Sequence, residues 1–208
     1  MVKVNAQIQL KQEHIIEAAL RRFSHFGVGK TTLSEIADDL GISKTLLFYY
    51  FHDKNALIAA VAFTIIREFI TAFEEVLEGA STLEAGLLGL VGVKREHFKK
   101  YFLLALQGDE IDIQKNQGAL TAHYQEGRNQ LVNMLAALLQ KGIHAKTVRP
   151  LDAVKTSQLL LDTLTAFDYT MKRRNVIPDL ENIEELFEKQ KEILLLFLNG
   201  LKPQACKH

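Results

Sequence analysis

The stretch that decides the fold runs from Thr32 to Phe51 and reads TLSEIADDLGISKTLLFYYF. Apolar residues recur in it at three- and four-residue spacing, which is typical of helices with one buried face. Gly41 interrupts this spacing. The pattern therefore predicts two short helices, over residues 33–40 and 44–50, joined by a tight turn as in a helix-turn-helix motif.

Capping residues stand where these helices should begin. Thr32 and Glu35 form the T-x-x-E pattern of a capping box, and Ser43 is a favoured N-cap for the second helix. Asp53 is an N-cap candidate for a longer helix that reaches about residue 78. Upstream, a helix over about residues 11–26 is expected to end at Gly27, because glycine accepts the left-handed conformation of a helix C-cap.

The second helix of the motif has two different faces. Leu47 and Phe51 are four residues apart and are expected to anchor it to the other helices. The outward residues are then Lys44, Thr45, Leu46, Phe48 and Tyr49. Exposed Leu, Phe and Tyr side chains on one short helix indicate a surface that meets a partner.

The residues GVGKT, from Gly27 to Thr31, resemble the end of a nucleotide-binding phosphate loop. That loop requires an earlier glycine, and Ser24 stands in its place. It also follows a buried strand, whereas the preceding residues, EAALRRFSHF, have the pattern of an amphipathic helix. The stretch is therefore interpreted as the entry to the helix-turn-helix, and an NTPase is disfavoured.

The remainder of the chain also has helical spacing. We expect further helices near residues 83–90, 94–107, 118–140, 150–174 and 180–199. Pro150, the first of three prolines, is expected in the first turn of the helix that it opens. The prediction is an all-α protein of about nine helices. Its N-terminal three-helix domain spans residues 1–53, and a larger helical domain spans residues 54–208.

Composition limits the functional classes. The chain has 208 residues, no formal net charge at pH 7 and a single cysteine, so any nucleic-acid binding must depend on a local surface. The N-terminus has no apolar stretch long enough for a signal peptide and no membrane-spanning run is predicted, and we therefore expect a cytoplasmic protein. The seven histidines show no metal-ligand spacing and no serine stands in a nucleophile motif, so no enzyme, metal or cofactor is predicted.

Residues 27–57, GVGKTTLSEIADDLGISKTLLFYYFHDKNAL, resemble the DNA-binding domain of the tetracycline-repressor (TetR) family of bacterial regulators. The shared pattern is a glycine, a Thr-Thr pair, Ile-Ala, then Gly-aliphatic-Ser, an aromatic run ending in Tyr-Phe, and x-x-Lys-x-x-Leu. Three positions depart from it: Phe48 replaces a usual tyrosine, Thr45 and Leu46 replace a Gly-Thr pair, and Val28 replaces an aromatic residue. These departures affect a phosphate contact, base contacts and packing, respectively.

The resemblance implies binding to a palindromic double-stranded operator. Lys54 is then a phosphate clamp, and Lys44 and Thr45 are base readers at the start of the recognition helix. The complete set of predicted DNA-binding residues is Thr31, Thr32, Ser43, Lys44, Thr45, Leu46, Phe48, Tyr49, Tyr50 and Lys54.

The resemblance also implies a homodimer, formed by the last two helices, and an effector site among the middle helices. The apolar stripes proposed for the dimer contact are Leu159, Leu160, Thr163, Leu164, Phe167 and Met171, and Ile183, Leu186, Phe187, Leu194, Phe197 and Leu198. The predicted ligand-binding residues are Phe69, Phe73, Phe98, Tyr101, Phe102, Tyr124 and Phe167, with His97, Gln107 or His123 as polar groups.

The expected function is a dimeric transcriptional repressor that a small, mostly hydrophobic effector releases from DNA. The alternative is a DNA-binding regulator or architectural protein that has no small-molecule effector and acts through a protein partner.

Overall fold

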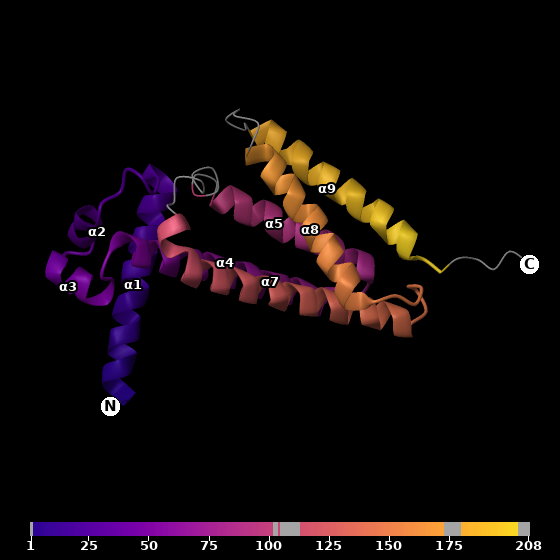
Figure 1. Cartoon of the computed structure of the whole chain (residues 1–208), viewed down its shortest axis with the longest axis horizontal. Helices are drawn as coiled ribbons and strands as arrows, with labels where there is room; N and C mark the ends of the chain where they lie inside the picture. The colour runs from indigo at the N-terminus through magenta and orange to yellow at the C-terminus, as the bar shows by residue number, and fades with distance from the viewer. Residues whose placement is uncertain (1, 102–103, 105–112, 173–179, 204–208) are drawn as a thin grey trace, which may run out of the picture. The chain divides into compact units, whose positions relative to one another are not determined.

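The computed structural model describes residues 2–101, 104, 113–172 and 180–203. These residues form eight helices and no strand, which confirms the predicted all-helical class (Figure 1). The helices are α1 (Val2–Phe26), α2 (Leu33–Asp39), α3 (Lys44–Tyr50), α4 (Lys54–Gly79), α5 (Leu83–Lys100), α7 (Ile113–His144), α8 (Ala153–Lys172) and α9 (Leu180–Leu201).

The chain divides into two compact units. Unit 1 comprises residues 1–68 and 98–125, and unit 2 comprises residues 69–97 and 126–208. Unit 1 extends beyond the helix-turn-helix because Leu57, Ile58 and Val61, in the first turns of α4, join its core. The boundary expected between residues 53 and 54 stays a prediction.

Unit 1 has one apolar core beneath the helix-turn-helix. Its buried members come from α1, the following loop, α2, α3 and α4: Ile15, Ala18, Ala19, Phe23, Val28, Ile36, Ala37, Leu47, Phe51, Leu57, Ile58 and Val61. Ala37 is fully buried, and Ile42 packs at the edge of this core. The motif is therefore held by shared burial and not by the short helices alone.

Two glycines shape the turns of the motif. Gly27 ends α1 with a φ of 83°, and its N–H donates to the carbonyl oxygen of Phe23. Gly41 follows α2 with a φ of 62°, and its N–H donates to Asp38. Both φ values lie in the left-handed region that favours glycine, so the predicted stops at these two positions are confirmed.

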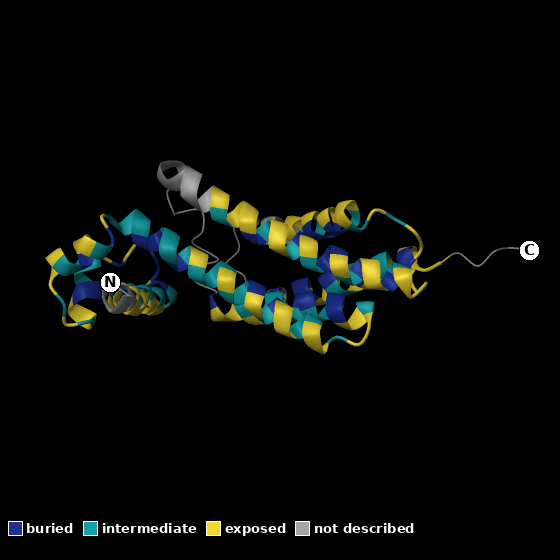
Figure 2. Cartoon of the chain, turned by 90° about the horizontal axis from the view of Figure 1, so that it is seen from below, coloured by how far each residue is buried: buried dark blue, intermediate teal, exposed yellow. Residues whose placement is uncertain are grey.

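Unit 2 has its own core, and each of its helices carries exposed residues beside buried ones (Figure 2). Phe73, Leu87, Leu135, Leu160 and Phe187 are among its fully buried side chains. Helices α8 and α9 pack against each other within it. This core therefore absorbs apolar residues from α4, α5, α7, α8 and α9.

Several helix boundaries differ from those expected. The two helices predicted near residues 83–90 and 94–107 form a single helix, α5, as far as Lys100. Gly142 does not end α7, which continues to His144. Pro150 precedes α8, whose first turn is capped by Asp152 through a 2.9 Å hydrogen bond from the Lys155 N–H to Oδ1. Capping by a side chain thus sets this start more directly than the proline does.

Helix α4 is strongly apolar. Within the described part of the chain it is the one helix long and apolar enough, by length and composition alone, to cross a membrane. Core helices of soluble proteins meet the same criterion, so this property is weak evidence for a membrane span.

Candidate nucleic-acid interface

Helix α3 presents an exposed face of mixed chemistry. Tyr49 is 73% exposed, and Phe48, Lys44 and Thr45 are exposed beside it. Leu47 points the other way and is fully buried. Because α3 has only seven residues, this buried leucine and the capped ends fix which side chains face outward.

The aromatic pair at the end of α3 is divided between surface and core. The rings of Tyr49 and Tyr50 meet edge to face, with their centroids 5.2 Å apart. Tyr50 is half-buried and packs against the unit 1 core, whereas Tyr49 is free to meet a partner. Leu46 is also half-buried, so it offers less surface than the sequence pattern suggested.

The start of α3 is capped by Ser43. Its Oγ accepts a 3.2 Å hydrogen bond from the N–H of Leu46, which confirms the expected cap. The side chain is exposed, and its predicted phosphate contact stays a prediction.

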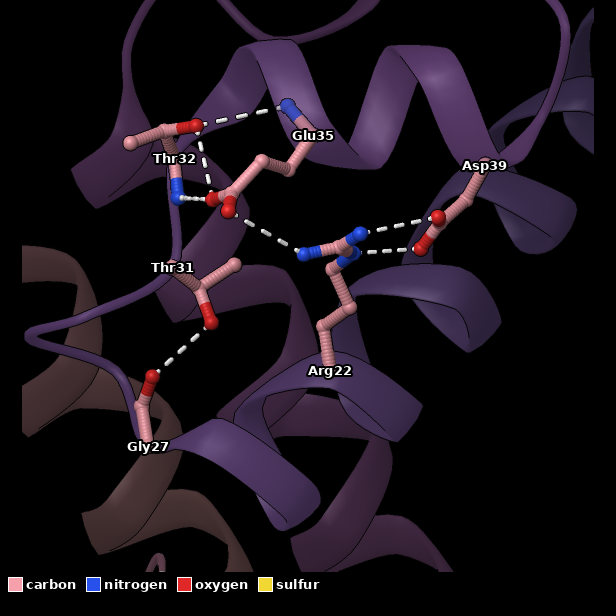
Figure 3. Close-up of polar contacts among 6 residues, drawn as sticks. All are labelled: Arg22, Gly27, Thr31, Thr32, Glu35 and Asp39. Atoms are coloured by element: carbon pink, nitrogen blue, oxygen red, sulfur yellow. Dashed lines mark hydrogen bonds and ion pairs between the residues drawn. The ribbon is translucent and has the colours of Figure 1, made fainter.

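The structure corrects the role expected of Thr31. This residue is only 1% exposed, and its hydroxyl donates a 2.9 Å hydrogen bond to the carbonyl oxygen of Gly27 (Figure 3). The hydroxyl thus closes the loop between α1 and α2. Buried in this way, it does not reach a phosphate, and we assign Thr31 to packing.

Thr32 forms the predicted capping box with Glu35. Oγ1 of Thr32 accepts from the Glu35 N–H at 3.3 Å, while Oε2 of Glu35 accepts from the Thr32 N–H and hydroxyl, each at 2.8 Å (Figure 3). Thr32 is exposed, but its hydroxyl proton is already directed to Glu35. A phosphate contact by this hydroxyl requires an exchange of partners.

Lys54 stands at the first turn of α4. Its Nζ donates a 2.6 Å hydrogen bond to the carbonyl oxygen of Val28, and the side chain is partly buried. Burial lowers the pKa of its ammonium, and the negative charge of Glu35 acts in the opposite direction. Asp53 caps the same helix through a 2.7 Å hydrogen bond from the N–H of Ala56 to Oδ1.

Arg22 lies at the centre of a charged cluster that the sequence pattern does not predict. Arg22, on α1, binds both carboxylate oxygens of Asp39 at the end of α2, and its Nη1 lies 3.4 Å from Oε1 of Glu35 (Figure 3). The acidic residues of α2 indicate that a basic partner is needed nearby. Glu35 and Asp39 are 13 and 17 residues from Arg22, however, so their pairing depends on how α1 and α2 pack.

The predicted ligand-binding residues fall in both units. In unit 2, Phe73 is fully buried, and half-buried Phe69 meets His97 edge to face with ring centroids 5.4 Å apart. In unit 1, Tyr101 is buried and donates a 2.5 Å hydrogen bond to Oε2 of Glu68, and burial raises the pKa of its phenol.

The other ligand candidates are less consistent with a pocket. Phe98 is half-buried, but Tyr124 is about half exposed, so its predicted place in an enclosed site is not supported. The ring of His123 packs against the ring of Phe63, with the two centroids 4.7 Å apart. Phe102, Gln107 and the side chain of Phe167 lie outside the described residues.

At least half of the residues predicted to form a dimer contact on α8 and α9 are instead buried within this chain. Leu160, Leu164, Ile183, Leu186, Phe187 and Leu194 are all buried in unit 2, which corrects their assignment to a dimer contact. Leu159 of the same predicted stripe is 60% exposed, however, and on α9 Leu196 is 72% exposed and Leu195 is also exposed. Met171 lies among the residues whose side chains are not described.

Fold and surface together define an all-helical protein with an N-terminal helix-turn-helix. Residues 15–61 match the family model of bacterial regulatory proteins, tetR family. Over these residues, the chain is similar to the DNA-binding domain of that family.

Individual proteins show the same similarity. The HTH-type transcriptional regulator RutR of Escherichia coli is 37% identical over 83 residues, which cover 40% of this chain and 39% of RutR. The match thus spans about two fifths of that relative. A transcriptional regulator from Cytophaga hutchinsonii has a TM-score of 0.82 and 27% identity, covering 93% of this chain and 99% of its own. FadR from Bacillus subtilis, solved with stearoyl-CoA, has the same fold, with a TM-score of 0.67 and 19% identity over 91% of this chain and 98% of its own.

Proposed function

We propose that this protein is a dimeric, ligand-responsive transcriptional regulator of the cytoplasm, which represses by binding a palindromic operator. The observation that carries the proposal is the outward face of α3, where Lys44, Thr45, Phe48 and Tyr49 are exposed while Leu47 is fully buried. An exposed, rigidly mounted helix of this kind suits the major groove of DNA.

The proposed contacts divide into phosphate clamps and base readers. Lys54 and Tyr49 are the clamps, with Ser43 and Tyr50 as further phosphate contacts. Lys44 and Thr45 read base edges from the first turn of α3, and Leu46 and Phe48 meet thymine methyl groups or sugars. Thr32 contributes through its place at the start of α2 once its hydroxyl exchanges partners.

Dimerisation is proposed because one short recognition helix reads too few base pairs. Two copies must present their recognition helices about 34–36 Å apart to meet successive major grooves. The proposed contact surface is the outward face of α8 and α9 that carries Leu159, Leu195 and Leu196. Large apolar side chains exposed together on two packed helices favour a four-helix contact between copies.

The effector is proposed to be a small, mostly hydrophobic molecule held by aromatic residues of the helical domain. Phe69 and Phe73 on α4 are the strongest candidates, since they lie in the same unit as His97. FadR, a protein of this fold, was solved with stearoyl-CoA, and the apolar acyl chain of that molecule supports a ligand with a hydrophobic part. Ligand binding is proposed to alter the separation of the two DNA-binding heads, which lowers operator affinity.

Selection from a pool of random double-stranded DNA tests the proposal. Recovery of an inverted repeat, bound with a stoichiometry of two chains, is the expected result. Recovery of unrelated sequences, bound weakly and with strong salt dependence, favours the architectural alternative. Absence of any duplex binding contradicts the proposal.

A further inference from the structure

Helix α2, the first helix of the helix-turn-helix, is acidic. It carries Glu35, Asp38 and Asp39 and no basic side chain. In a helix-turn-helix protein the first helix of the motif crosses the phosphate backbone. Uncompensated carboxylates there oppose the approach of DNA, most strongly at low ionic strength. The motif therefore requires a positive charge beside α2.

Arg22 supplies that charge from α1. Its Nη2 donates to Oδ1 of Asp39 at 2.9 Å and its Nε to the other oxygen, and Nη1 lies 3.4 Å from Glu35 (Figure 3). The planar guanidinium suits this two-point contact with a carboxylate. The hydrogen bond from Arg22 lowers the pKa of Asp39. The pKa of Glu35 is lowered mainly by the hydrogen bond from the Thr32 backbone, and the charge of Arg22 adds to this.

Glu35 connects this cluster to the predicted phosphate clamp. Its charge acts on Lys54 as well as on Arg22, since it raises the pKa that burial lowers at Lys54. Glu35 and Asp39 therefore share Arg22 as their counter-ion. Without Arg22, both carboxylates on α2 would be left without this ion pair, and their charge would oppose a DNA phosphate.

We infer that Arg22 is a positioning residue for DNA binding: it is the counter-ion of α2, and it balances the carboxylates of Glu35 and Asp39 where the phosphate backbone would pass. Arg22 need not touch DNA to act in this way. The inference rests on the proposed function and adds a residue that the sequence pattern did not indicate.

The test compares DNA binding by variants of the full chain, using fluorescence anisotropy. The probes are an operator duplex recovered by selection and a random-sequence duplex of equal length. Arg22→Ala is expected to weaken binding to both by about 5- to 10-fold at about 50 mM salt, and by less at about 200 mM, because the effect is electrostatic. Arg22→Lys keeps the charge and is expected to bind within about threefold of wild type.

A neutralised variant separates charge from helix packing. Arg22→Ala with Glu35→Gln and Asp39→Asn lacks the same ion pairs but keeps the capping box, since glutamine accepts the same N–H. It is expected to bind DNA within about twofold of wild type. Glu35→Gln with Asp39→Asn alone, which leaves Arg22 uncompensated, should bind more tightly than wild type. Arg95→Ala, which removes a surface ion pair with Glu184 in unit 2, is the matched control and should not change affinity.

Three results would overturn the inference. They are wild-type affinity in Arg22→Ala, an equal loss in the neutralised variant, or no gain in the Glu35→Gln, Asp39→Asn variant. The last comparison keeps Arg22 and its helix, so it remains decisive even where Arg22→Ala does not fold. Failure of the proposed function is distinguishable, because wild type itself would then bind neither duplex.

Discussion

The Nζ of Lys54 donates a 2.6 Å hydrogen bond to the carbonyl oxygen of Val28. This bond joins the first residue of α4 to the loop between α1 and α2. A lysine ammonium has three donors, so two remain for a phosphate once the third is fixed. In the proposed role of Lys54 as a phosphate clamp, this hydrogen bond fixes the side chain before DNA binds, which would reduce the entropy lost on binding.

Replacement of this clamp should weaken binding to every sequence alike. Lys54→Ala is expected to lower affinity for operator and random duplexes by a similar factor and to reduce the slope of log K against log salt by about 1. Anisotropy titrations at four or more salt concentrations measure both quantities. An unchanged slope would show that Lys54 makes no phosphate contact.

Replacement of a base reader should have a different signature. Thr45→Ala is expected to cost about 1–3 kcal/mol on the selected operator while random DNA binds as before. Repeating the sequence selection with this variant identifies the base pair whose preference is relaxed. If Thr45→Ala and Lys54→Ala behaved identically, the division into readers and clamps would be wrong.

The outward leucines should control assembly. Leu159→Glu and Leu196→Glu each place a charge on the proposed contact surface, so sedimentation velocity should detect monomers where wild type forms dimers. Leu10→Glu changes a similarly exposed leucine on α1 and is the control. Dimers that persist in both α8 and α9 variants would exclude this surface.

A pair of glycines on α5 should respond oppositely to the same change. A Cβ at Gly89 would lie 2.2 Å from Cγ1 of Val76, whereas one at Gly92 would meet nothing within 4 Å. Gly89→Ala should lower the free energy of unfolding by about 1–3 kcal/mol through overpacking. Gly92→Ala should raise it by about 0.5–1 kcal/mol through helix propensity. Denaturant titration measures both, and equal effects would contradict this close approach of α4 and α5.

Acid should remove the contribution of the Arg22 cluster. The pKa of Asp39 is lowered in the folded protein, so its stabilising effect is present above the ordinary carboxyl pKa and is lost as pH falls through the lowered value. Wild type should therefore unfold at a higher temperature than Arg22→Ala at pH 7, with the difference disappearing in acid. Thermal scans from neutral to acidic pH check this. A difference that persisted after both carboxyls protonate would point to packing by the arginine stem.

Local signals were sufficient to predict the helix-turn-helix. The caps at Thr32 and Ser43 and the glycines at 27 and 41 depend on neighbours within a few residues, and all four appear as expected. Thr31 was misjudged because its burial depends on how the loop folds over the core. The spacing of apolar residues within a short segment does not predict such tertiary packing.

The surfaces of α8 and α9 illustrate the same limit. Helical spacing correctly identified an apolar side on each helix, but it does not say whether that side is covered by the same chain or by a second copy. Leu160 and Leu194 are buried within unit 2, whereas Leu159, Leu195 and Leu196 are exposed to solvent. Arg22 was missed for a related reason, since its partners are distant in sequence.

Footprinting tests the proposed operator binding most directly. The full chain should be incubated, at several salt concentrations, with DNA fragments that include the region upstream of its own gene. Protection of a short inverted repeat, with half-sites about one helical turn apart, is the predicted result and would also provide the DNA for an effector screen. Uniform, salt-sensitive protection without a preferred site would contradict the account and would make Thr45, Leu46 and Phe48 the first residues to reconsider.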